Sequence, residues 1–262
     1  MKNEVIAICF TLLLLILVET RKKISLTKKP RHRHEYLPFS AHKMCLTGKN
    51  QTPIDFNTKK ILTRMKNSNL EVKYAPTLTG VLSWYHHTWK MKLDKNNGNH
   101  VMFFNKEKNK FIKYTLLQFH MHIPSEHTFD GEEVDAEYHF VHKTDEPVQK
   151  NLLVLGIMAK KVSSVPRGTE NVFGGLVLNK KSTIKDFDKL FKGKQFYHYD
   201  GSLTTPPCNE SVNWFILKDV KPILEKQIEE MTSIMETKTK HRHFNRPTTP
   251  LNGRKVYLTT SK

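Results

Sequence analysis

Three histidines near the middle of the chain have the spacing of a metal site. His120 and His122 are two residues apart, and His139 follows after a polar segment. On a β-strand, residues i and i+2 point to the same face, so the first two imidazoles would lie side by side. Three neutral imidazoles with one open position form a catalytic zinc site, whereas a structural site closes with a fourth protein ligand. The spacing therefore points to a catalytic zinc centre.

Two neighbouring strands are needed to bring these histidines together. Residues 114–123 are rich in β-branched and aromatic side chains, which favour a strand over a helix. Residues 134–142 have the same character, and residues 130–133 between them have the composition of a turn. If the two strands pair antiparallel, His139 comes to lie beside the His-x-His pair.

Each strand also carries a side chain that could orient its histidine. A His-x-His pair alone is a weak signal in a chain with 14 histidines. However, Gln118 lies two residues before His120, and Glu137 lies two residues before His139. Metal-bound histidines usually donate their other N–H to a carboxylate, an amide oxygen or a backbone carbonyl. The repeated offset strengthens the prediction of a metal site.

Four motifs resemble those of the α-class carbonic anhydrases, and most closely those of bacterial, exported members. They read Gln-Phe-His-x-His, Ser-Glu-His-Thr, Ala-Glu-x-His-x-Val-His and Gly-Ser-Leu-Thr-Thr-Pro-Pro, within a similarity running from about Met44 to Tyr257. The resemblance implies that His120, His122 and His139 bind Zn²⁺. It also implies reversible hydration of carbon dioxide to bicarbonate and a proton, by a zinc-bound hydroxide with a histidine proton shuttle.

The same resemblance assigns catalytic roles to Glu126 and Thr204. A threonine hydroxyl has one proton to donate. If Thr204 donates it to an ionised Glu126, its oxygen can only accept from the zinc-bound hydroxide, which orients that nucleophile. Thr205 would lie near the departing bicarbonate. The implied apolar wall for carbon dioxide, whose members would also suit an ordinary core, consists of Val141, Val154, Leu203, Val212 and Trp214.

A fast enzyme of this kind needs a base with a pKa near 7 to remove the proton, and histidine suits that range. The resemblance places His87 at the shuttle position. Strand alternation predicts that His86 and His87 face opposite ways, so that only His87 looks into the cavity. The alternative is that both are exposed polar residues at a strand end.

The chain has three cysteines, of which Cys9 lies in an apolar N-terminal run. The other two, Cys45 and Cys208, form an even pair, which in an exported chain favours a disulfide. The resemblance supports this pairing, because both cysteines lie in segments that resemble the two ends of the family's bridge. The alternative is two buried free thiols.

The apolar run at residues 5–18 fits the core of a signal peptide and is short for a membrane span, which needs about 20 residues. Positive charges follow it immediately and oppose export, so an uncleaved anchor remains an alternative. We expect a leader or anchor at 1–20, a basic linker at 21–43 and one catalytic domain at 44–262. The protein would then be exported, as a periplasmic or secreted protein or one held at the membrane by its N-terminus.

The net charge of the chain is +18, which would suit nucleic acid or an anionic surface. No nucleic-acid motif accompanies the charge, so we expect a small-molecule substrate and no nucleic-acid partner. The sequence does not fix the oligomeric state.

Many strands and few helices are expected in this chain. Further strands are predicted at residues 70–74, 80–84, 88–93, 151–160 and 212–217, and helices at 184–191 and 222–235. Together they predict a mainly β, single domain built on a large, twisted, mostly antiparallel central sheet with a few peripheral helices.

Three functions compete at this point. They are a carbonic anhydrase, a carbonic-anhydrase-like binding domain that has lost a zinc ligand, and a zinc esterase. All three histidines are present together with Glu126 and Thr204, which favours the enzyme. Because the apolar wall favours a small gas, we treat ester hydrolysis as a side activity.

Overall fold

The computed structural model describes residues 39–60, 63–65, 69–93, 96–165, 176–240 and 244–262. The predicted leader and nearly all of the predicted linker lie outside these residues. In the described part of the chain, no helix is long and apolar enough to cross a membrane. The described residues all belong to one compact unit, Tyr36–Lys262.

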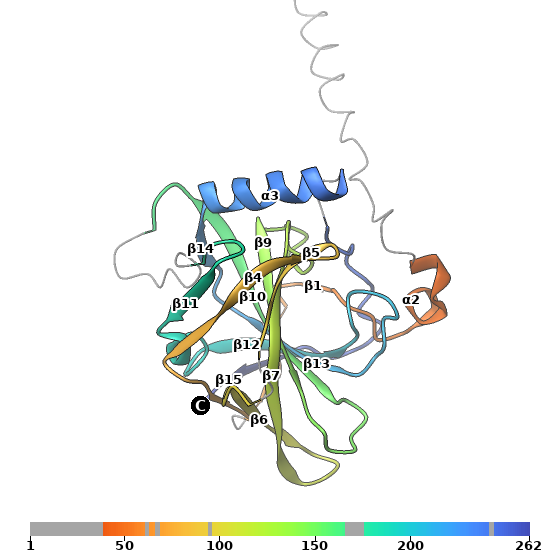
Figure 1. Cartoon of the computed structure of the whole chain (residues 1–262). Coiled ribbons are helices and arrows are strands. Elements are labelled where there is room, and N and C mark those ends of the chain that lie inside the picture. Colours follow the sequence, from red (N-terminus) through yellow and green to blue (C-terminus); the bar gives the residue numbers. More distant parts are fainter. Residues whose placement is uncertain (1–38, 61–62, 66–68, 94–95, 166–175, 241–243) are drawn as a thin grey trace, which may run out of the picture. The chain divides into compact units, whose positions relative to one another are not determined.

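Within the described residues, a large twisted sheet of 13 strands forms the centre of this unit, while the first and eighth strands in chain order form a separate two-stranded sheet (Figure 1). The strands are β1 Asp55–Phe56, β2 Thr63–Arg64, β3 Leu70–Lys73, β4 Thr77–Tyr85, β5 Thr88–Lys92, β6 His100–Asn105, β7 Lys110–His122, β8 Thr128–Phe129, β9 Ala136–Lys143, β10 Leu152–Val162, β11 Lys181–Lys185, β12 Gln195–Gly201, β13 Val212–Leu217, β14 Lys221–Leu224 and β15 Tyr257–Thr260.

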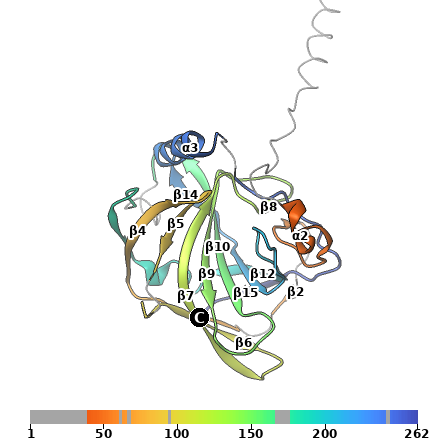
Figure 2. The same cartoon turned by 45° about the vertical axis from the view of Figure 1, so that its right-hand side comes forward.

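The central strands of the sheet follow the order β11-β4-β5-β7-β9-β10-β13-β12-β15-β2. From β11 to β10 every neighbouring pair is antiparallel, and Figure 2 shows β7, β9 and β10 side by side. Parallel pairings join β10 to β13, β10 to β14 and β15 to β2. The predicted mainly β domain is thus confirmed, and its antiparallel centre is extended into a mixed sheet.

Helices are few and lie at the periphery. They are α2 Lys43–Thr47 and α3 Glu225–Thr239, with short 3₁₀ turns η1 Phe39–Ala41 and η2 Phe187–Lys189. Helix α3 buries Ile228, Met231 and Met235. The Trp89 indole N–H of β5 donates to the Met231 carbonyl, 3.5 Å away, so α3 covers that part of the sheet.

Both helix predictions need correction. Residues 221–224 form β14, which pairs in parallel with β10, so the helix predicted from residue 222 begins only at Glu225. The helix predicted at 184–191 is wrong: Ile184 lies in the edge strand β11, and only η2 is helical. In β11, buried Ser182 and Ile184 alternate with exposed residues, which is the period of a strand.

The pairing of β7 with β9 gives the sheet two chemically different faces at its centre. Phe119 lies opposite Phe140, with ring centroids 5.1 Å apart, and both are fully buried in the larger apolar cluster. The next pair along, His120 and His139, points to the other face because side chains alternate. One face therefore packs the core, and the other is free to line a cavity.

Candidate metal centre

The three predicted histidines converge on one face of β7 and β9. Their ring centroids lie 5.0 Å (His120–His122), 5.1 Å (His120–His139) and 4.8 Å (His122–His139) apart. One nitrogen of each ring lies within 4.8 Å of the others. The rings line a cavity of about 160 Å³. His122 and His139 are buried, whereas His120 is half-buried.

Hydrogen bonds fix two of these rings through the side chains noted in the sequence. The Gln118 Oε1 atom lies 3.0 Å from His120 Nδ1, so this nitrogen donates to it. The Glu137 Oε1 atom lies 2.8 Å from His139 Nε2. These bonds leave His120 Nε2 and His139 Nδ1 without protons and available as ligands.

The third ring is oriented by a backbone group. His122 Nδ1 donates to the Phe244 carbonyl, 3.1 Å away, although the two residues are 122 positions apart. The opposite nitrogen, His122 Nε2, is buried and has no hydrogen-bond partner in the described structure. A buried polar atom without a partner costs free energy, so this nitrogen is well placed to bind a metal ion.

The donor set fits zinc. Burial lowers the pKa of all three rings, and their mutual proximity lowers the pKa of His120 and His139 further. The rings are therefore neutral imidazoles at ordinary pH, which is the form that binds metal. Among the described residues, no fourth His, Cys, Asp or Glu joins these three nitrogen ligands, which matches a catalytic zinc site that keeps an open position.

A second cluster, His127 with Glu137 and His139, is held together by hydrogen bonds instead. His127 Nδ1 lies 2.6 Å from Glu137 Oε1, and His127 Nε2 lies 2.6 Å from the Tyr199 hydroxyl. Burial alone would raise the pKa of Glu137, but His127 and His139 hold it well below the usual range. Glu137 is thus an ionised acceptor that orients a ligand. His127 belongs to the Ser-Glu-His-Thr motif, for which the sequence predicted a role only at Glu126.

Glu126 is buried beside the histidines. Its Oε1 accepts the backbone N–H of Arg246 at 3.0 Å. Its Oε2 has no hydrogen bond of ordinary geometry among the described residues, yet the Thr204 hydroxyl is close enough to lower the pKa of Glu126. Burial outweighs these contacts and raises that pKa to about 7. A small movement of Thr204 would complete the predicted hydrogen bond.

Apolar side chains form one wall of the cavity. Val141, Val154, Leu203 and Trp214 line it, and Thr205 lies beside Thr204 at its edge. The Trp214 ring centroid lies 4.8 Å from that of His139. Val212, which we expected in this wall, is fully buried within the same apolar cluster and supports the wall from behind.

The opposite wall is polar, and here one expectation needs correction. His86 and His87 occupy a turn between β4 and β5, with a left-handed φ of 56° at His86, so strand alternation does not apply to them. Both histidines line the cavity. His87 is half-buried and its ring stacks on that of Phe244, with centroids 6.1 Å apart. Its pKa is lowered to about 4, chiefly by burial and further by the proximity of His122, His86 and Lys90.

The predicted disulfide is present. Cys45 in α2 is bonded to Cys208, across a sequence separation of 163 residues. Cys208 follows the loop that carries Thr204 and Thr205. Arg246 adds to this link, because its guanidinium donates to the Cys45 and Thr52 carbonyls at 3.1 and 2.7 Å. The cavity edge is therefore anchored to the start of the described chain.

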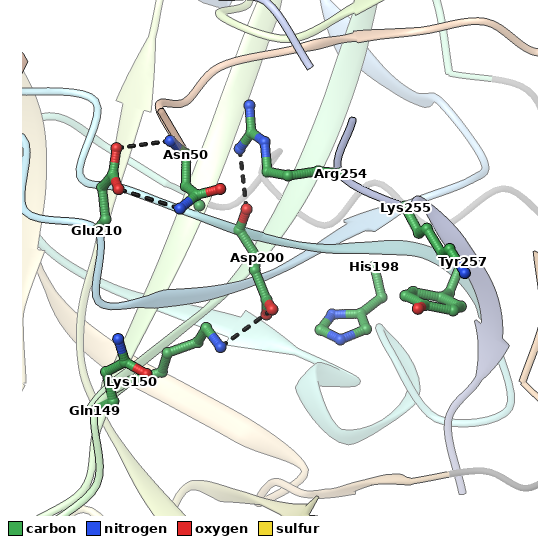
Figure 3. A pocket seen from close by; sticks show the side chains of 10 residues that line it. Asn50, Gln149, Lys150, His198, Asp200, Glu210, Arg254, Lys255 and Tyr257 are labelled. Atoms are coloured by element: carbon green, nitrogen blue, oxygen red, sulfur yellow. Dashed lines mark hydrogen bonds and ion pairs between the residues drawn. The ribbon is translucent and has the colours of Figure 1, made fainter. Parts of the chain in front are cut away.

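A larger cavity of about 300 Å³ lies elsewhere on the molecule (Figure 3). Several of its charged side chains have partners within the protein: Lys150 pairs with Asp200 at 3.1 Å, and Glu210 accepts from Asn50. Arg254 donates to the Asp200 carbonyl at 2.9 Å. The size of a cavity therefore does not identify the reactive site. The smaller cavity contains the three histidines that could bind a metal ion.

Comparisons with known proteins identify the family of the chain. The family model for eukaryotic-type carbonic anhydrase matches residues 34–260, and so begins before our expected boundary at residue 44. Alpha carbonic anhydrase 3 of Arabidopsis thaliana is 34% identical over 231 residues, covering 82% of this chain and 76% of its own. A carbonic anhydrase of Neisseria gonorrhoeae is 32% identical over 217 residues, covering 82% and 79%.

A solved structure agrees in fold as well as sequence. The α-carbonic anhydrase of Thermovibrio ammonificans, in complex with the inhibitor sulfanilamide, is 32% identical with a TM-score of 0.63, covering 82% of this chain and 89% of that one. The family model and these relatives define a lyase of the carbonate dehydratase class. The chain belongs to the α-class, or eukaryotic-type, carbonic anhydrase family.

Proposed function

We propose that this protein is a zinc enzyme that interconverts carbon dioxide with bicarbonate and a proton. The observation that carries the proposal is the set of three neutral imidazoles whose free nitrogens converge, one of them buried without a partner. Zinc in such a site lowers the pKa of a coordinated water from about 15.7 to about 7 and so supplies a nucleophile at ordinary pH.

Thr204 and Glu126 orient that nucleophile. Burial raises the pKa of Glu126 to about 7, and the Arg246 N–H and the Thr204 hydroxyl act against burial, so these two donors favour the ionised carboxylate as an acceptor. With its only proton donated to Glu126, Thr204 has only lone pairs left for the nucleophile. The nucleophile would then donate a hydrogen bond to Thr204 Oγ1, which would turn one of its lone pairs toward the substrate.

The apolar wall binds carbon dioxide. This substrate is small, uncharged and apolar, so a surface of Val141, Val154, Leu203 and Trp214 holds it without competing hydrogen bonds. The same side chains keep bulk water from the reacting carbon. Thr205, at the polar edge, is placed to meet the bicarbonate as it leaves.

The turn at residues 86–87 carries the proton away. His87 stacks on Phe244 within the cavity, and His86 is exposed at the same turn. With a pKa of about 4, His87 is neutral at pH 7 and can accept a proton, although burial makes the acceptance unfavourable. Exposed His86 offers an exit to bulk buffer.

We further propose that the protein is exported. The Cys45–Cys208 disulfide and the similarity to bacterial carbonic anhydrases support an oxidising compartment. The described residues include no membrane-spanning helix, and the apolar run at 5–18 lies outside them.

Stopped-flow hydration of carbon dioxide, with zinc measured on the same samples, tests the function. We expect activity in proportion to zinc content, loss of activity on metal removal, and recovery when zinc is restored. Full activity in a metal-free preparation would overturn the proposal.

A further inference from the structure

Strand β5 brings two lysines to the polar side of the cavity. Lys90 lies directly opposite His120 in the pairing of β5 with β7, and Lys92 lies opposite Gln118. Directly opposed residues in an antiparallel pair project from the same face of the sheet. Both lysines therefore leave the sheet on the histidine face, and Lys90 lines the histidine cavity.

One aromatic ring, that of Tyr85, contacts the ammonium groups of both lysines. Lys90 Nζ lies 4.3 Å and Lys92 Nζ 4.5 Å from the centroid of Tyr85, which also lines the cavity. A cation over an aromatic face is attracted to it. Two cations on the same ring also repel each other, so this arrangement favours a shared counter-ion.

No such counter-ion comes from the protein within the described residues. Their ion pairs include neither Lys90 nor Lys92, and no carboxylate lines the cavity. The neighbouring polar groups, His86 and His87, do not supply negative charge either. A cleft lined by unpaired charge of one sign concentrates ligands of the opposite sign.

We propose that Lys90, with Lys92 behind it on Tyr85, forms an anion-binding site at the mouth of the histidine cavity. It takes the carboxylate, or a similar oxyanion, of a ligand whose other end lies at the metal. The inference rests on the proposed function, because zinc anchors that other end. It makes Lys90 a residue that selects anionic over neutral ligands.

The test uses two matched sulfonamides, because sulfanilamide occupies the related Thermovibrio ammonificans enzyme. One is 4-carboxybenzenesulfonamide, and the other is its neutral carboxamide. Calorimetry on the zinc-loaded protein at neutral pH should give an affinity about fivefold higher for the carboxylate, as expected for a partly exposed ion pair. Added salt should reduce this preference.

Substitutions at the two lysines show which residue causes the preference for the carboxylate. Lys90→Gln should abolish it while leaving affinity for the carboxamide unchanged, and Lys92→Gln should reduce it. Lys90→Arg should retain it, because the charge is kept. Lys113→Gln, an exposed lysine on β7, is the matched control and should behave as the parent.

The possible results separate the two proposals. Equal affinities for the two sulfonamides in the parent, or a preference that persists in Lys90→Gln, would overturn the anion site and leave the zinc enzyme intact. Failure of both sulfonamides to bind a zinc-supplied parent would overturn the proposed function, and the anion site with it. If Lys90→Gln misfolds and binds neither ligand, two other measurements test the anion site. A preference for the carboxylate that is kept in Lys90→Arg and weakened by salt in the parent supports the site, and a preference that salt does not change overturns it.

Discussion

His120 on β7 and His139 on β9 lie directly opposite each other, with ring centroids 5.1 Å apart. A one-residue slip of this pairing would turn His139 to the other face, into the core that Phe119 and Phe140 fill. The apolar packing on one face therefore fixes the ligand geometry on the other.

Replacing His139 with alanine should remove most of the bound zinc and nearly all hydration activity. Loss of an orienting partner typically costs about 10–100-fold in metal affinity, and loss of a ligand should cost at least as much. Zinc analysis after dialysis, together with stopped-flow assay, measures both effects. His100→Ala, on β6, serves as control. A full zinc equivalent with parental activity in His139→Ala would contradict the assignment.

Thr204→Ala should keep its zinc and lose about 10–100-fold in hydration rate, the worth of one hydrogen bond to a charged group. The ligands are untouched, but the nucleophile loses its orientation and Glu126 its partner. Thr204→Ser should recover much of the rate, whereas Thr183→Ala on β11 should change nothing. A parental rate in Thr204→Ala would show that the assigned network is wrong.

Thiol titration of the unfolded full-length chain should find one free cysteine before reduction and three after it. Cys9 accounts for the free thiol, and the Cys45–Cys208 bond accounts for the other two. In the chain-entropy model, removing a bridge over so long a loop lowers the free energy of unfolding by about 5 kcal/mol. Denaturant titration of the double serine variant measures that loss. Three thiols before reduction would disprove the bridge.

His87→Ala should slow hydration in weak buffer, and added imidazole should restore the rate, while His86→Ala should do little. The reason is that His87 is the residue stacked inside the cavity. The structure makes the comparison sharper, because both side chains line the cavity. If the defect and its rescue follow His86, the exposed histidine is the shuttle. If neither variant shows them, another group carries the proton.

The protein should lose stability as the pH falls below about 6.5. Burial lowers the pKa of His142 to about 3, so the unfolded chain binds this proton more readily than the folded one. Each such histidine costs about 1.4 kcal/mol per pH unit between the unfolded and folded pKa values. Denaturant titrations of His142→Gln should show a shallower fall between pH 6.5 and 4. An unchanged slope would disprove the assignment.

The strands at the centre of the fold were predictable because their side-chain patterns are unambiguous. Residues 212–217 coincide with β13, and residues 151–160 fall almost wholly within buried β10. The wrong helix at 184–191 came from a short mixed segment in which a strand ends and a 3₁₀ turn begins. Short apolar runs of this kind do not distinguish helix from strand.

Parts of the site were not predictable for a different reason. His122 is oriented by the backbone carbonyl of Phe244. Every residue has such a carbonyl, so the residue type does not indicate which one forms this hydrogen bond. The left-handed conformation of His86 is uncommon for residues other than glycine, and the enrichment of histidine in this region is too small to predict it at one position. Side-chain partners at an offset of two, such as Gln118 and Glu137, were visible because strand geometry relates them directly to their histidines.

The contacts of residues 244 and 246 also determine when, during synthesis, the site can form. His122 and Glu126 form hydrogen bonds with backbone groups that lie 122 and 120 residues further along the chain. At a synthesis rate of about 5–20 residues per second, the ribosome adds these partners roughly ten seconds after it adds His122 and Glu126. A nascent chain thus contains the histidines before it contains the groups that orient them, and the arrangement around His122 and Glu126 forms only after residues 244 and 246 have been synthesised.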